Sequence, residues 1–202
     1  MAEHFQQLTG INLMEAFFNL DKKGERILNF LKTVFSEKEN QVLESLLKLA
    51  NEKGRSSGCT EMILLLLAFF GEKEEHMFHY VEKTSLAEEV EMEDVPAAPC
   101  LIVCGSSCFT ADCFMLSIDQ KIVNDDITAF SCAVCLMFGS YYCFNIHYPV
   151  GLRSTLEFLQ RCFFSINLER GTKVEHSKRG KFFAVNPRVL TLIADLADHE
   201  WT

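Results

Sequence analysis

Cys100-Leu101-Ile102-Val103-Cys104-Gly105 is the stretch that decides the fold class. Short apolar runs closed by a turn residue are typical of buried strands. Phe114–Ile118 is a second run of this kind. Upstream of both, apolar residues recur at helical spacing. The sequence therefore predicts an α+β protein that is mainly α, with a helical N-terminal half packed against a small mixed sheet and helices in the C-terminal half.

The apolar pattern of the first 84 residues predicts helices. An apolar face at helical spacing is formed by Ile27, Leu28, Leu31, Val34 and Phe35. Ser36 and Glu39 have the spacing of a capping box, which would start a helix reaching Lys53. A central apolar helix is expected over 60–70, ended by Gly71, and one more short helix over 74–83.

The second half mixes strands and helices. Asp126 is expected to cap a helix over 127–138. The aromatic-rich run Tyr141–Ile146 predicts a third strand. An amphipathic helix is expected over 152–166. Asn186 followed by Pro187 is a typical helix start.

These elements divide the chain into five parts. The interpretation assigns a helical region to 1–84, an acidic linker to 85–99, an α/β region to 100–168, a basic loop to 169–185 and a C-terminal helix to 186–202. The alternative is that all five parts form one compact domain.

Composition limits the class of function. The chain has 202 residues, of which 49% are hydrophobic, and a net charge of −9. That charge argues against general binding to nucleic acid or anionic lipid. Between Glu72 and Asp94 nine carboxylates face two lysines, whereas 173–181 is basic. Both segments are expected to be solvated. One alternative is that they dock on each other or on partners of opposite charge. Another is that the basic segment binds nucleic acid.

The nine cysteines are expected to stay reduced. Residues 1–10 show no secretory signal, which favours a cytoplasmic location, with the nucleus as the alternative. No membrane span is expected, since the apolar run 62–70 is too short and the run 127–146 is interrupted by polar groups.

Several cysteines and histidines are candidate metal ligands. Cys132 and Cys135 have C-x-x-C spacing but lie in an apolar run, where a thiol behaves as a small hydrophobe. His76 and His79 lack the spacing of a zinc helix. Close spacing is also shown by Cys100, Cys104, Cys108 and Cys113. Core packing is the expected role of these thiols, and no metal site is predicted.

One segment carries the alternative hypothesis of an enzyme or nucleotide-binding protein. Gly105-Ser106-Ser107 follows a predicted strand but matches neither a phosphate loop nor a nucleophile elbow. Cys104 or Cys108 with His147 would be a thiol nucleophile with its base. A deep polar pocket joining these three residues and Asp112 would favour this alternative, with a site near Gly105–Cys113.

The run Leu136-Met137-Phe138-Gly139-Ser140-Tyr141-Tyr142-Cys143-Phe144-Asn145-Ile146-His147-Tyr148-Pro149 is followed by Thr155-Leu156-Glu157-Phe158-Leu159-Gln160. Together they resemble the C-terminal region of sterile-alpha-motif-domain-containing protein 3-like proteins, a group expanded in fishes. The resemblance covers most of residues 11–168. It implies no catalytic residue, cofactor or substrate. The chain departs from the group's name because nothing in it resembles a sterile alpha motif.

The sequence thus predicts a non-enzymatic protein-interaction module. No catalytic, cofactor-binding or metal-binding residue is assigned. A protein partner is expected, but the sequence identifies neither the partner nor the oligomeric state.

Overall fold

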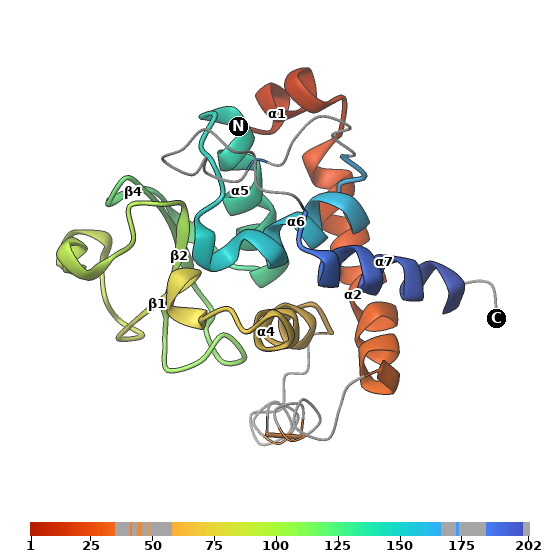
Figure 1. Ribbon diagram of the computed structural model, residues 1–202. Coiled ribbons are helices and arrows are strands. Elements are labelled where there is room, and N and C mark those ends of the chain that lie inside the picture. Colours follow the sequence, from red (N-terminus) through yellow and green to blue (C-terminus); the bar gives the residue numbers. More distant parts are fainter. Residues whose placement is uncertain are drawn as a thin grey trace.

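The computed structural model describes residues 1–34, 41, 44, 45, 48, 58–166, 173 and 185–199. In these residues helices pack beside a four-stranded mixed sheet, which confirms the α+β class (Figure 1). No helix of the described segments is both long enough and apolar enough to cross a membrane.

The helices and strands occupy the following ranges. The α-helices are α1 (Ala2–Thr9), α2 (Leu13–Val34), α4 (Gly58–Phe70), α5 (Phe130–Cys143), α6 (Arg153–Cys162) and α7 (Pro187–His199). Short 3-10 turns are η1 (Glu74–His76), η2 (Ala87–Glu89), η3 (Met92–Asp94) and η4 (Val150–Leu152). The strands are β1 (Phe78–Val81), β2 (Cys100–Cys104), β3 (Phe114–Ile118) and β4 (Lys121–Ile127).

The sheet has the strand order β1-β2-β3-β4. β1 runs parallel to β2, whereas β2–β3 and β3–β4 are antiparallel pairs. Val103 of β2 lies opposite Phe114 of β3. β3 and β4 are joined by Asp119 and Gln120, whose φ angles are 52° and 55°. Two positive φ angles in a two-residue connection match the twist of a hairpin.

The main core lies between the sheet and the helices. Leu101 and Val103 of β2 belong to it. The ring of Phe138 in α5 stacks on that of Phe164, with centroids 3.9 Å apart. Phe5 of α1 meets both rings edge-on, at 6.4 and 5.9 Å. The first helix is therefore held by rings from the second half of the chain.

A second, smaller core covers the other face of the sheet. It contains Cys100, Ile102 and Cys104 of β2, together with Val90 and Val95 from the acidic stretch. Because both faces of β2 are covered, all five of its residues are buried. This double burial explains why the strand is continuously apolar rather than alternating.

Several sequence predictions are confirmed. β2 and β3 have the predicted bounds. The central helix α4 ends before Gly71, whose φ is 67°. Asn186 caps α7, since its Oδ1 accepts a hydrogen bond of 3.0 Å from the backbone N–H of Arg188.

The prediction of a third strand over Tyr141–Ile146 is wrong, because α5 continues to Cys143. The run is rich in aromatic and apolar side chains, and such a run suits a buried helix as well as a buried strand. Tyr141 is fully buried in α5, and its hydroxyl donates to the Pro99 carbonyl at 3.1 Å. Asp126 is also not a helix cap: it lies in β4, and the helix begins at Phe130.

The helix predicted over 74–83 is wrong as well. Only a 3-10 turn forms at Glu74–His76, and Phe78–Val81 is a strand. Its aromatic and β-branched residues suit a strand, and pairing with β2 overrides the local helical pattern.

In the N-terminal half, Ile27, Leu28 and Leu31 are buried as predicted, but Val34 is 41% exposed. The capping box of Ser36 and Glu39 lies outside the described residues, as does most of the helix predicted to follow it. Gln41, Glu44, Ser45 and Lys48 are helical and exposed.

Candidate functional site

An open groove lies at the carboxyl ends of β1 and β2, a common position for ligand sites beside parallel strands. Its volume is about 720 Å³, and it is lined by residues 80–83 with Gly105, Ser106 and Thr110. It corresponds to the place where the sequence put its enzyme alternative. Lys83 holds an ion pair of 2.8 Å with Asp112, so this lysine is already engaged.

The four residues proposed for a thiol-dependent site do not line this groove. Cys104 is buried in the second core and Cys108 in the main core. Asp112 is bound to Lys83 at the surface. His147 lies in the connection after α5. These four side chains therefore do not meet in this groove.

The thiol of Cys108 is held in its protonated form. Burial raises the pKa of Cys108 to about 12, although the Tyr80 hydroxyl, 3.2 Å from the sulfur, acts in the opposite direction. The one O–H proton of Tyr80 is donated to the Glu74 carboxylate. Burial likewise raises the pKa of Cys100 to about 12. Activated cysteines have a lowered pKa, whereas burial raises that of these two thiols.

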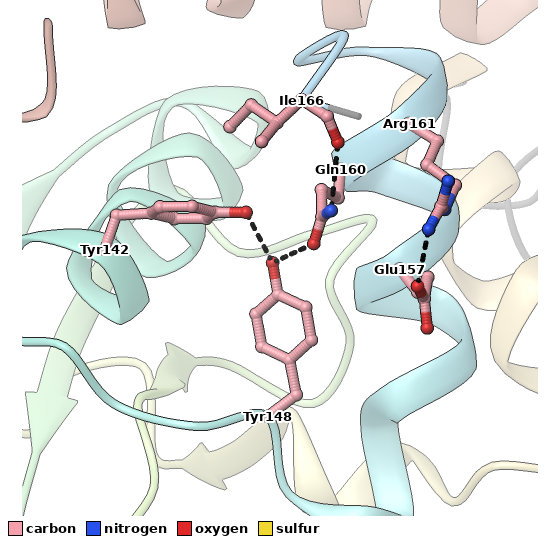
Figure 2. Close-up of polar contacts among 6 residues, drawn as sticks. All are labelled: Tyr142, Tyr148, Glu157, Gln160, Arg161 and Ile166. Carbon is pink, nitrogen blue, oxygen red and sulfur yellow. Dashed lines mark hydrogen bonds and ion pairs between the residues drawn. The ribbon is translucent and has the colours of Figure 1, made fainter. Parts of the chain in front are cut away.

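A buried polar network joins α5, α6 and the connection between them (Figure 2). The Tyr148 hydroxyl donates to Gln160 Oε1 at 3.1 Å and lies 3.3 Å from the Tyr142 hydroxyl. Gln160 Nε2 donates to the Ile166 carbonyl at 2.9 Å. Tyr148 and Gln160 are fully buried, and burial raises the pKa of Tyr148 well above its usual range. The partners of these polar groups all belong to the same chain, so the network has a structural role.

This network includes polar residues from two runs of the sequence, 136–149 and 155–160. Tyr148 belongs to the first of the two quoted runs, and Gln160 ends the second. Glu157, also in the second run, pairs with Arg161 at 3.1 Å on the same helix (Figure 2). Burial and pairing account for the polar groups of Tyr148, Glu157 and Gln160.

No group of three or more metal-ligating side chains occurs among the described residues. Cys132 and Cys135 lie on α5, half-buried and buried respectively. His76 ends η1, where it packs so closely on Gly151 that a Cβ there would collide with the imidazole. His79 lies in β1. The two histidines thus do not share the helix that the sequence predicted for them.

A second cavity, of about 580 Å³, lies between α2, α6 and α7. Its lining includes Lys23, Arg26 and Arg161 beside apolar side chains such as Phe30 and Leu196. Among the described residues its lining contains no carboxylate, but it does include Cys162 and His199.

The acidic stretch lies against the sheet rather than spanning open space. Val90 and Val95 are buried in the second core. Gln120 Nε2 donates to three carbonyls of the stretch, those of Met92 at 3.1 Å, Glu93 at 3.3 Å and Val95 at 3.0 Å. The amide of Gln120 therefore clamps the stretch to the β3–β4 hairpin.

The carboxylates of the same stretch point outward. We call them the acidic ridge; its members, all exposed, are Glu88, Glu89, Glu91, Glu93 and Asp94. Glu89 also accepts a hydrogen bond of 2.9 Å from the Leu86 N–H, which closes η2. In the sequence, the valines at 90 and 95 were the sign that this stretch packs against the fold, because their apolar side chains anchor an otherwise charged segment.

Comparison of the chain with family models, with curated proteins and with solved structures found no match.

Proposed function

We propose that this chain is a non-enzymatic protein-interaction module, acting in the cytoplasm or the nucleus, that binds a basic partner protein through the acidic ridge. The observation that carries the proposal is that five exposed carboxylates stand on a segment anchored by Val90, Val95 and the Gln120 clamp. An ordered surface loses less conformational entropy on binding than a free loop. Concentrated negative charge also steers basic partners and rejects acidic ones.

The alternative, an enzyme or nucleotide binder near Gly105–Cys113, has weaker support. A nucleotide phosphate needs free cations or backbone donors, but the groove contains Glu82, and its Lys83 is paired with Asp112. The nearby Cys108 has a raised pKa and lies outside the groove lining. The resemblance stated for residues 11–168, which implies no catalytic residue, agrees with a binding role.

Proximity labelling in cells tests the proposal through matched charge reversals. One variant carries Glu91→Lys, Glu93→Lys and Asp94→Lys; the control carries Glu25→Lys, Asp195→Lys and Asp198→Lys, also exposed carboxylates. Both change the net charge equally. We expect a set of basic proteins to be labelled by the wild type and the control but lost with the ridge variant. Equal labelling by both variants would show that the ridge is not the interface.

Direct binding then separates contact from proximity. A partner found in this way, purified and titrated against the wild type, should bind more weakly as salt rises, because exposed charges are screened. Affinity that does not depend on salt would contradict an electrostatic interface.

A further inference from the structure

Two cysteines face each other across the β2–β3 pair. Cys104 ends β2 and Cys113 immediately precedes β3. The register that sets Val103 opposite Phe114 continues to set Cys104 opposite Cys113. The Cys104 N–H donates to the Cys113 carbonyl at 3.1 Å, so this is a backbone-bonded cross-strand position.

The Cα spacing expected at this position permits a disulfide. Directly opposite residues of a hydrogen-bonded antiparallel pair have Cα atoms about 5.5 Å apart. Disulfides join cysteines whose Cα atoms are about 4.4–6.8 Å apart. Both side chains lie on the face of the second core. Both cysteines are free thiols.

The two sulfurs already interact. Burial raises the pKa of Cys104 to about 11, and the neighbouring thiol of Cys113 contributes to the rise. The two thiols differ in access, since Cys104 is 2% exposed whereas Cys113 is half-buried. A reagent from solution therefore reaches Cys113 first.

We propose that Cys104 and Cys113 are a site of reversible oxidation, converted to an intrachain disulfide by a small disulfide of the oxidised-glutathione class. The Cys113 thiolate attacks one sulfur of the reagent RSSR, which forms a Cys113–S–S–R mixed disulfide and releases one RSH. The Cys104 thiolate then attacks the Cys113 sulfur, which closes the protein disulfide and releases a second RSH. The protein loses two hydrogens and two electrons, and RSSR gains them.

The same strand supplies a matched control. Cys100 lies four residues before Cys104 on the same buried face of β2, and burial raises its pKa too. The residue opposite Cys100 is Ser117, which has no thiol. If burial on this face were enough for oxidation, Cys100 would react as Cys104 does; if an opposite thiol is required, it will not.

The experiment treats the folded protein with oxidised glutathione, blocks remaining thiols with N-ethylmaleimide and digests without reduction. A protease that cuts before aspartate separates Cys113 from Cys104 at Asp112. Mass spectrometry of the wild type should show these two peptides joined, with fragment ions that assign the bond to Cys104. Dithiothreitol should restore both thiols. Closure should accelerate as pH rises, because the attacking Cys104 thiol has a pKa of about 11.

Three variants decide the outcome. Cys104→Ser should stop at a stable glutathione adduct on Cys113, and Cys113→Ser should show neither an adduct at Cys104 nor a joined peptide. Cys100→Ser should oxidise as the wild type does. The proposal is overturned if the wild type yields no Cys104–Cys113 bond or if the joined peptide persists in Cys104→Ser. It is also overturned if Cys113→Ser acquires glutathione at Cys104 as fast as the wild type forms the joined peptide.

Discussion

The hydroxyl of Tyr148 and the side-chain carbonyl of Gln160 lie 3.1 Å apart in the interior, where Tyr148 is the donor. Tyr148 belongs to the run 136–149 and Gln160 to the run 155–160. Their contact fixes the connection between α5 and α6 against α6 itself. The pattern that looks most specific in the sequence thus has a structural explanation.

Removing this bond should destabilise the fold. Tyr148→Phe leaves the buried Gln160 Oε1 without its donor, and an unsatisfied buried group costs about 1–3 kcal/mol. Tyr142→Phe is the control, because its hydroxyl is half-buried and lies farther away, at 3.3 Å. We expect a loss below about 1 kcal/mol there. Urea unfolding measures both; equal losses would contradict the importance given to the Tyr148–Gln160 bond.

Glu72 should act as a cap for a helix that lies far from it in sequence. Its carboxylate accepts hydrogen bonds from the backbone N–H groups of Ser154 at 2.7 Å and Thr155 at 3.0 Å, in the first turn of α6. Glu72→Ala should cost about 0.5–2 kcal/mol, since the donors lose their partner and the helix dipole loses a negative charge. Glu75→Ala, an exposed neighbour, should change thermal unfolding little. A similar drop in both melting temperatures would refute the capping role.

The Gln120 clamp should control local rather than global stability. Gln120→Gly removes the amide that binds three carbonyls but relieves the positive φ of 55°. We expect faster amide exchange at 92–95 with a nearly unchanged unfolding free energy. Asp119→Gly also relieves a positive φ, of 52°, but keeps the clamp, so exchange at 92–95 should stay slow. Fast exchange in both variants would mean that the turn, rather than the amide, holds the acidic stretch.

The buried thiols should react slowly and make stability sensitive to alkali. Cys100 and Cys108 have pKa values of about 12, so alkylation of the folded protein at neutral pH should be slow and should rise about tenfold per pH unit. The folded state keeps these protons at pH values where the unfolded chain loses them. Stability should therefore fall as pH rises from about 8.5 towards 12. Rapid labelling of Cys108 at pH 7, read by mass spectrometry, would revive the enzyme hypothesis.

The sequence predicted those elements whose pattern fits one structure only. The run at Cys100–Cys104 is too short for a helix and ends at a glycine, so its strand was predictable. The run at Tyr141–Ile146 was not, because its aromatic side chains suit a buried helix equally, and only packing against Phe5 and the Pro99 carbonyl decides between them. Phe78–Val81 became a strand through its pairing with β2, a contact between distant segments.

The candidate sites divide in the same way. The charge of the acidic stretch was visible in the sequence, but its fixed position depends on Gln120, far along the chain. Cys104 and Cys113 were both noted as closely spaced thiols. Their pairing depends on the β2–β3 register, which composition and spacing do not determine.

The contact of Phe5 with Phe138 and Phe164 also sets an order of events during synthesis. The chain leaves the ribosome from its N-terminal end, so α1 emerges long before Phe138 and Phe164, whose rings cover Phe5. Until Phe164 has left the exit tunnel, the ring of Phe5 lacks one of the two rings that cover it. While the chain is being made, α1 therefore exposes apolar surface of the kind that chaperones bind.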